Sequence, residues 1–289
     1  MENNVVGIIS GTGLGDALSE QIKSRESCIV DTPFGKPSDK VLIGNIGQTR
    51  VAFINRHGEG HIYCPSMVPY AANIFALKKL GVKTVLATGA VGSLREEIAP
   101  GNVVVVDQFI DKTFKRTNSF FLDFGAVHCE MAEPCCTRLG KIFVETSNEI
   151  DIKTHPTGTY VCMEGPQFST KAESQMHRTW GADVIGMTGM PEAKLAREAQ
   201  MCYSLVALVS DYDCWREHKT NKQTLLEEIM SNLKKATYNC LQLIEAVLSN
   251  KRELVCDDCS CRKSLDLAVW TDTNKINKEL KKRLKILFK

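Results

Sequence analysis

Short apolar runs alternate with helical patterns along most of this chain, and that alternation limits the fold more than any other feature. Strands that alternate with helices favour a three-layer α/β architecture around one central sheet. The expected strands lie at residues 5–9, 41–46, 50–54, 84–88, 102–106, 159–163, 183–187 and 203–210. The expected helices lie at residues 70–80, 137–149, 172–179, 191–200 and 223–248. We therefore predict a single-domain αβα sandwich around a twisted mixed β-sheet, with an antiparallel hairpin at 41–54.

The composition of the sequence changes near residue 250. The chain's 289 residues, 43% of them hydrophobic, can bury one large core or two small ones. Because no internal repeat or Pro/Gly linker interrupts residues 1–250, we expect one domain there. Residues 251–289 hold a cysteine cluster and then a basic stretch whose aliphatic residues recur at helical spacing between 276 and 287. We expect that helix to pack on its own domain, although a partner protein or a membrane surface would also fit the pattern.

Charge and targeting signals narrow the class of protein. The net charge is +2 with acids and bases nearly balanced, which gives no long-range field suited to nucleic acid or an anionic membrane. The N-terminus lacks the basic and then apolar build of a secretion signal. No apolar run approaches the length of a transmembrane helix. We therefore expect a soluble cytoplasmic protein with neither nucleic acid nor membrane as partner.

Twelve cysteines are many for such a protein. Most stand alone in apolar surroundings, which fits free buried thiols. Cys256, Cys259 and Cys261 lie within six residues of one another. They could form a disulfide or a redox pair, remain spectator thiols, or bind zinc. A closed zinc site needs four ligands, and the sequence shows no fourth with zinc-like spacing.

Two carboxylates follow the apolar run at 205–209. Asp211 and Asp213 stand at i and i+2, so on an extended chain they share one face, about 7 Å apart. Desolvation and mutual repulsion disfavour two charges in such a place. We expect one carboxyl to hold a proton near neutral pH and to donate it to a leaving group. The alternative is a pair of solvated loop acids or helix caps.

Candidate anion donors follow three other strand-like runs. The glycine-rich turn at 7–15 departs from the dinucleotide fingerprint but could hold free phosphate, with the Thr12 hydroxyl as a donor. Arg56 offers a permanently charged donor fork, and His57 could add a donor. A small-residue turn is expected at 89–94. Each of these three segments, taken alone, could be a plain turn or form a surface ion pair. Ligands of open α/β sheets, however, bind at strand ends.

The same motifs in the same order make the sequence similar to the trimeric nucleoside phosphorylase family. The matching segments cover residues 5–248 and are Gly11-Thr12-Gly13-Leu14, 31–39, Arg56-His57-Gly58, 92–97, 107–111, 131–134, Glu164-Gly165-Pro166, 178–183 and 211–215. The resemblance implies that family's fold, a homotrimer or a dimer of trimers, and no metal or organic cofactor. The branch that it resembles most cleaves 5'-methylthioadenosine with inorganic phosphate, giving adenine and 5-methylthioribose 1-phosphate. The Cys-Ser-Cys at 259–261 resembles that of archaeal thermophilic members, where such cysteines form disulfides.

The resemblance also implies roles for particular residues. Those for phosphate are Thr12, Arg56, His57, Gly89, Ala90 and Thr188. Those for the base are Phe168, Ser169, Asp211 and Asp213, with Asp211 as the general acid; considered from its own turn alone, Phe168 could equally be a core residue. Met187 is implied as the ribose contact. The alkylthio pocket is implied to consist of Leu225 and Leu226, with His128 contributed by a neighbouring subunit.

Specificity follows from hydrogen-bond polarity. A 6-amino group needs an acceptor, and this chain has Asp211 and Ser169 where 6-oxopurine enzymes of the family carry Asn and Glu, so we expect adenine to be favoured. Several positions depart from the family pattern. Gly89 lacks the hydroxyl of the relatives, which would weaken phosphate binding by about 1 kcal/mol. Gly186 and residues 189–193 resemble methylthioinosine phosphorylases. A methylthioinosine or broad purine nucleoside phosphorylase, acting on adenosine, inosine or guanosine, is thus the second candidate, and a catalytically weak nucleoside-binding protein the third.

Overall fold

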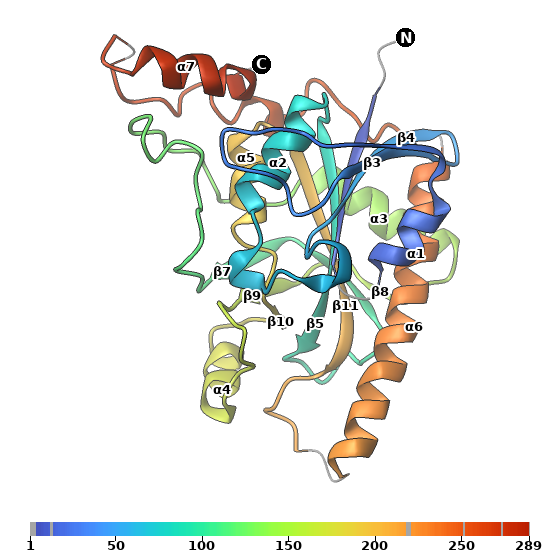
Figure 1. The fold of residues 1–289 in the computed structure, drawn as a ribbon. Coiled ribbons are helices and arrows are strands. Elements are labelled where there is room, and N and C mark those ends of the chain that lie inside the picture. The colour runs from blue at the N-terminus through green and yellow to red at the C-terminus, as the bar shows by residue number, and fades with distance from the viewer. Residues whose placement is uncertain (1–3, 12–13, 218–220, 251, 273, 289) are drawn as a thin grey trace.

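A computed structural model provides the fold, which is built on one mixed sheet (Figure 1). The structure describes residues 4–11, 14–217, 221–250, 252–272 and 274–288. The strands are β1 (Val6–Ser10), β2 (Lys23–Cys28), β3 (Val41–Ile46), β4 (Thr49–Asn55), β5 (Thr84–Ser93), β6 (Val103–Val106), β7 (Gln108–Asp111), β8 (Thr154–His155), β9 (Thr159–Cys162), β10 (Val184–Gly186) and β11 (Cys202–Tyr212). The helices are α1 (Gly15–Gln21), α2 (Tyr70–Lys79), α3 (Thr137–Glu149), α4 (Lys171–Thr179), α5 (Glu192–Glu198), α6 (Lys222–Ser249) and α7 (Lys278–Leu284). Short 3₁₀ turns are η1 (Glu59–His61), η2 (Pro65–Met67), η3 (Ser260–Lys263) and η4 (Lys285–Phe288).

The sheet branches at β5. Its main path runs β2-β3-β4-β1-β5-β10-β9-β7, while β11 pairs with β5 and β6, and β6 also pairs with β8. The strands β4, β1, β5 and β11 are mutually parallel, so their carboxyl ends meet at one edge of the sheet. The hairpin expected at 41–54 is confirmed as the antiparallel pair β3–β4.

Helices cover both faces of the sheet, which confirms the predicted αβα sandwich. One large apolar core takes in side chains of α2 and α5, and a second large core takes in side chains of α1, α3 and α6. The hydrophobic periodicity of these helices therefore serves burial against the sheet. No helix among the described residues combines the length and the apolar character that a membrane span requires.

The extent of β5 differs from the sequence prediction. The small residues at 89–94 were expected to turn, yet β5 continues to Ser93 because β11 pairs with it along almost its whole length. Tertiary pairing here overrides the weak strand propensity of glycine. The elements β2, β7, β8 and α1 were not predicted at all.

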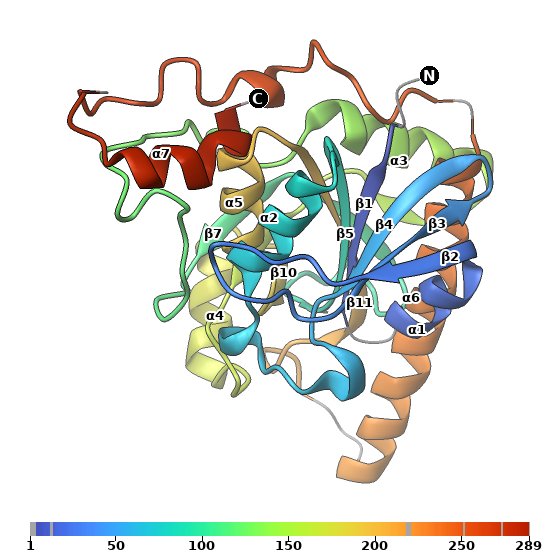
Figure 2. The same ribbon diagram turned by 45° about the horizontal axis from the view of Figure 1, so that its top comes forward.

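The C-terminal segment packs on the domain, as expected for its amphipathic helix. Figure 2 follows it from the end of α6 along one side of the molecule to α7, which lies beside α2 and α5. Leu284 and Leu287 are fully buried in the same core as α2 and α5. The Gln200 amide donates to the carbonyl of Leu287 at 2.9 Å, and the Ser264 hydroxyl donates to that of Arg197 at 2.6 Å. Burial and hydrogen bonds together attach the segment.

This attachment can be tested with a matched pair of leucines. Leu287 is 0% exposed, whereas Leu267 in the same segment is 92% exposed. We expect Leu287→Ala to lower the free energy of unfolding by about 2–5 kcal/mol, because it removes buried apolar atoms and leaves a cavity. Leu267→Ala should change it by less than about 0.5 kcal/mol. Urea unfolding of both variants measures the difference, and equal effects would contradict the packing of the tail.

Candidate active site

A cavity of about 520 Å³ opens at the carboxyl ends of the parallel strands. Ligands of open α/β sheets bind at this edge. Most of the residues singled out from the sequence line it: Arg56, His57, Gly89, Ala90, Phe168, Ser169, Met187, Thr188, Asp211, Asp213 and Leu225. Thr12 lies outside the described residues. His128 and Leu226 are not among the lining residues of this cavity.

A buried arginine forms one end of the cavity. Arg56 follows β4, is 0% exposed, and donates through Nε and Nη2 to the two carboxylate oxygens of Glu192 at 2.8 and 2.9 Å. Its Nη1 donates to the Thr88 carbonyl at 2.8 Å. Burial lowers the pKa of Arg56, but the charge and hydrogen bonds of Glu192 outweigh burial and raise it. The guanidinium is thus a fixed cation whose remaining N–H groups are left for a ligand.

Glycine at position 11 is required by this arginine. A Cβ at Gly11 would lie 2.8 Å from Nη1 of Arg56 and 3.6 Å from Nε2 of His57. A larger residue would therefore push the guanidinium out of position. The glycine-rich turn after β1 serves close approach of the backbone to these two side chains.

His57 is a neutral imidazole at ordinary pH. Its Nδ1 lies 2.8 Å from the Tyr63 carbonyl, and its ring stacks on His61 with centroids 4.2 Å apart. Burial, together with the charges of Arg56 and His61, lowers the pKa of His57 to about 4 despite that carbonyl. The carbonyl takes the proton of Nδ1, so Nε2 is an acceptor in the neutral ring. The donor role expected from the sequence would require a protonated ring.

Small residues and a hydroxyl form the floor next to Arg56. A Cβ at Gly89 would lie 3.3 Å from Oγ1 of Thr188, so the Thr188 hydroxyl faces the space that a larger residue at 89 would take. The backbone N–H of Thr188 donates to the Tyr160 hydroxyl at 3.3 Å. A Cβ at Gly186 would come within 2.0 Å of that same hydroxyl. Gly186 thus leaves the room in which Tyr160 holds the Met187-Thr188 backbone.

Arg116 fixes the other side of this backbone, and sequence reasoning missed it. It donates to the Met187 carbonyl at 2.7 Å and pairs with Glu164 at 3.1 Å. Burial would raise the pKa of Glu164, but hydrogen bonds from Ser66, from two backbone N–H groups and from Arg116 lower it to about 2. A carboxylate with so many donors stays ionised and rigid. Nothing in the local sequence marked Arg116, because its hydrogen-bond partners lie 46 or more residues away.

Two carboxylates form the opposite end of the cavity. The register of β11 against β5 shifts between Val209 and Asp211, so that Asp211 pairs with Gly92. A Cβ at Gly92 would lie 3.4 Å from Cβ of Asp213 and 3.6 Å from Oδ2 of Asp211, so both acids lie directly beside this glycine. The Ser210 hydroxyl donates to Oδ1 of Asp211 at 2.5 Å. Oδ2 of Asp213 is buried without a hydrogen-bond partner among the described residues, although the residue lines the cavity.

Apolar and aromatic side chains complete the walls. Phe168 is 86% exposed although it lines the cavity, so it stands at the mouth and is not a core residue. Leu225 and Ile229 from α6 both line the cavity, as residues one helical turn apart share a face. Leu226 is 58% exposed on another face of the helix. The spacing i, i+4 would have pointed to Ile229, which the sequence analysis did not single out.

His128 occupies a different place in the chain. It lines a second cavity, and its ring meets Trp270 edge to face with centroids 5.1 Å apart. Its expected contact with the site of a neighbouring subunit is not tested by a single chain and stays a prediction.

Comparison with known proteins agrees with this geometry. Residues 5–249 match the family model described as the phosphorylase superfamily. The chain is 42% identical to the S-methyl-5'-thioadenosine phosphorylase of Geobacter sulfurreducens, over 98% of this chain and 97% of that protein. It is 43% identical to the one of Nitrosopumilus maritimus, over 93% of this chain and 99% of that protein.

Solved structures give the same result. A methylthioadenosine phosphorylase from an antarctic soil metagenomic library superposes with a TM-score of 0.89 at 40% identity, covering 99% of each chain. A mutant adenosine/methylthioadenosine phosphorylase from Schistosoma mansoni in complex with methylthioadenosine gives a TM-score of 0.78 at 35% identity, covering 85% of this chain and 91% of that one. The chain therefore belongs to the phosphorylase superfamily and, within it, to the branch of the S-methyl-5'-thioadenosine phosphorylases.

Proposed function

We propose that this protein is a pentosyltransferase that cleaves S-methyl-5'-thioadenosine with inorganic phosphate, giving adenine and 5-methylthioribose 1-phosphate. The observation that carries the proposal is the lining of one cavity by a fixed guanidinium, Arg56, and by a pair of carboxylates, Asp211 and Asp213. An attacking anion and a departing purine need opposite hydrogen-bonding environments on the two sides of the sugar. The family supports the reaction class.

Phosphate binds at the arginine end of the cavity. The free N–H groups of Arg56, the Thr188 hydroxyl and the backbone at Ala90 donate to its oxygens, and Thr12 of the preceding turn is proposed as a further donor. Because the pKa of His57 is lowered to about 4, its neutral Nε2 accepts from the protonated oxygen of phosphate. The bound anion then stabilises the oxocarbenium-like transition state at C1' of the sugar.

The purine binds at the carboxylate end. Asp211 faces N7 and the 6-amino group, and the carboxylate of Asp213 beside it assists. A protonated Asp211 gives its proton to N7 as the C1'–N9 bond breaks, so that the base leaves as a neutral molecule. Ser169 lies at the same wall, and Phe168 covers the ring from the mouth of the cavity.

The remaining parts of the substrate bind between these ends. Met187 contacts the ribose, and Leu225 with Ile229 forms an apolar slot for the methylthio group. We further propose a homotrimer or dimer of trimers, in which His128 of a neighbouring subunit completes that slot. The reaction needs phosphate as a co-substrate and neither a metal nor an organic cofactor, and its products suit methionine and purine salvage in the cytoplasm.

The substrate assignment is tested by comparing two nucleosides. We expect adenine release from methylthioadenosine only when phosphate is present, and a kcat/KM at least about 100-fold lower for methylthioinosine, because its 6-oxo group would face a carboxylate acceptor. Chromatographic separation of the free bases measures both rates. Faster cleavage of methylthioinosine would favour the second candidate, and nucleoside binding without any phosphorolysis would favour a binding protein.

The role of Asp211 as general acid is tested by replacing its carboxyl group with an amide. We expect Asp211→Asn to lower kcat on methylthioadenosine by about 100- to 10,000-fold, because the amide has no acidic proton to transfer. Any residual activity should shift toward 6-oxopurine nucleosides, since the amide can donate to a carbonyl. Steady-state kinetics on both substrates, with circular dichroism as the control for folding, measure this. Unchanged kinetics on methylthioadenosine would mean that the base binds elsewhere.

The neutral state of His57 has a consequence for stability. A histidine whose folded pKa lies near 4, below its unfolded value near 6.5, favours the folded state above pH 6.5, and this contribution disappears as the pH falls through 4. Between pH 7 and 4.5 the wild type should therefore lose about 2–3 kcal/mol more unfolding free energy than His57→Asn, which cannot be protonated. Urea unfolding at the two pH values measures the difference. Parallel losses in both proteins would show that His57 is not a buried neutral ring.

A further inference from the structure

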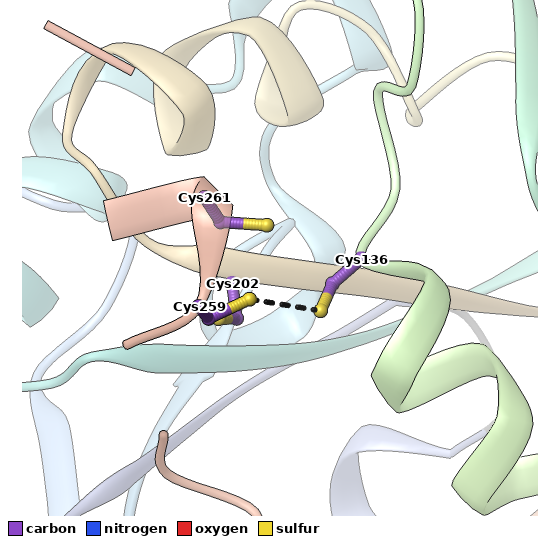
Figure 3. Close-up of side chains that lie close together, drawn as sticks. All are labelled: Cys136, Cys202, Cys259 and Cys261. Atoms are coloured by element: carbon purple, nitrogen blue, oxygen red, sulfur yellow. Dashed lines mark hydrogen bonds between the residues drawn. The ribbon is translucent and has the colours of Figure 1, made fainter. Parts of the chain in front are cut away.

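Four cysteines from three separate parts of the chain meet at one point. The sulfur atoms of Cys136, Cys202, Cys259 and Cys261 all lie within 4.8 Å of one another, and those of Cys136 and Cys259 are 3.8 Å apart. Figure 3 shows the side chains turned toward a common space between α3, β11 and the C-terminal segment. Cys136 caps α3, Cys202 begins β11, and the other two belong to the turn around η3. The fold thus brings Cys136 and Cys202, two further candidate metal ligands, to Cys259 and Cys261 from distant parts of the sequence.

We propose that these four cysteines bind one Zn²⁺ ion in a closed tetrahedral site. A zinc–sulfur distance of about 2.3 Å in a tetrahedron corresponds to sulfur atoms about 3.8 Å apart. The spacing between Cys136 and Cys259 already has this value, and the upper limit of 4.8 Å leaves only small side-chain movements for the other pairs. Three of the four residues are buried, which suits a structural site without an open position.

Positive charge near the sulfurs favours thiolates, the form that binds zinc. Cys136 stands at the start of α3, where the positive end of the helix dipole stabilises a negative charge. Arg138, in the first turn of α3, donates to the carbonyls of Glu253 and Leu254. Its charge interacts with the sulfurs of Cys136 and Cys202, and its buried Nε has no partner among the described residues. A cation here offsets the negative charge of a four-thiolate zinc site.

The geometry fits a metal better than two disulfides. A disulfide needs two sulfurs at about 2.05 Å and an oxidant that removes two electrons. All four sulfurs lie within 4.8 Å of one another, and none of the four cysteines is joined in a disulfide in the structure. Binding of Zn²⁺ needs no electron transfer, since the four sulfurs bind as thiolates and any thiol protons go to solvent. Cys256 lies outside the cluster of four, so its position does not complete a second site.

The role of such a site is structural. It joins the start of α3 and the start of β11 to the C-terminal segment, which also contacts the domain through apolar side chains, hydrogen bonds and ion pairs such as that of Lys83 with Asp257. Asp211 lies at the other end of β11, about 30 Å away for a strand of that length. The metal therefore stabilises the fold and does not touch the reacting atoms.

The test begins with the full-length wild-type protein, purified with a thiol reductant and without chelator. We expect elemental analysis to find about one zinc ion per chain. After removal of zinc, added Co²⁺ should give the strong visible absorption and the sulfur-to-metal charge-transfer bands of tetrahedral cobalt thiolate. This spectroscopic readout does not depend on whether any variant folds.

Variants then identify the ligands. Cys259→Ser and Cys136→Ser should lose most of the bound zinc and melt at least about 5 °C lower. Cys240→Ser is the matched control, because Cys240 is buried in α6 but lies outside the cluster. It should keep the zinc of the wild type. Below the melting temperature, kcat on methylthioadenosine should be similar in folded Cys259→Ser and wild type.

Two outcomes would overturn the site. The first is a fully reduced wild-type protein that takes up neither Zn²⁺ nor Co²⁺, with thiol titration of the untreated protein showing cysteines that react only after reduction; disulfides would then occupy this place. The second is equal metal loss in Cys240→Ser and Cys259→Ser, which would place the ion elsewhere. Neither outcome bears on phosphorolysis, which is assayed independently.

Discussion

The buried ion pair of Arg56 and Glu192 sets the conditions for the rest of the site. A guanidinium with no exposed surface is tolerated because Glu192 takes two of its N–H groups and the Thr88 carbonyl a third. The Tyr203 hydroxyl, itself buried, donates to Glu192 at 2.9 Å and holds the acid in place. Breaking such a pair by removing one partner typically costs about 3–5 kcal/mol, so the cation is anchored to the core of the domain.

This pairing also changes how phosphate can be bound. The charge of Arg56 is already balanced by Glu192, so net charge at the arginine end contributes little attraction. Affinity must then come from positioned donors, namely the free N–H groups of Arg56, the hydroxyl of Thr188 and the backbone beside Ala90. Phosphate binding is also linked to the protonation of His57. A bound anion would favour the protonated ring and so oppose the effect of burial, which lowers the pKa of His57. The site is organised by geometry more than by long-range attraction, in keeping with a nearly neutral chain.

Two neighbouring strands fix the distance between the ends of the cavity. The floor of the cavity next to Arg56 includes Gly89 on β5. Asp211 on β11 pairs with Gly92 of the same strand β5. Three residues of an extended strand span about 10 Å, enough for a pentose between an anion and a purine. The separation of the two ends is thus a property of the sheet, and it does not depend on loop conformation.

The sequence was sufficient for the layers of the fold and for most of the cavity, and it failed where distant segments cooperate. Apolar periodicity located the buried strands and helices, and the strand-end residues Arg56, His57, Asp211 and Asp213 do line one cavity. The continuation of β5 through its glycines, the Arg116–Glu164 pair and the joining of Cys136 to Cys259 all arise from contacts between segments far apart in the chain. Local patterns carry no information on such contacts. For this reason the sequence around Cys259 offered three candidate zinc ligands and no fourth.

The glycine departures from the family pattern have a structural explanation that bears on whether the site is functional. At Gly186, any side chain would collide with the hydroxyl of Tyr160, and that hydroxyl accepts from the backbone N–H of Thr188. The room left by the missing side chain is therefore filled by a buried tyrosine that supports the same backbone. At Gly89, the Thr188 hydroxyl already faces the vacated space. Loss of function would leave gaps without partners, whereas the space at Gly89 and at Gly186 is met by a hydroxyl from another strand or turn, as expected of a site that still has to hold its ligands in fixed positions.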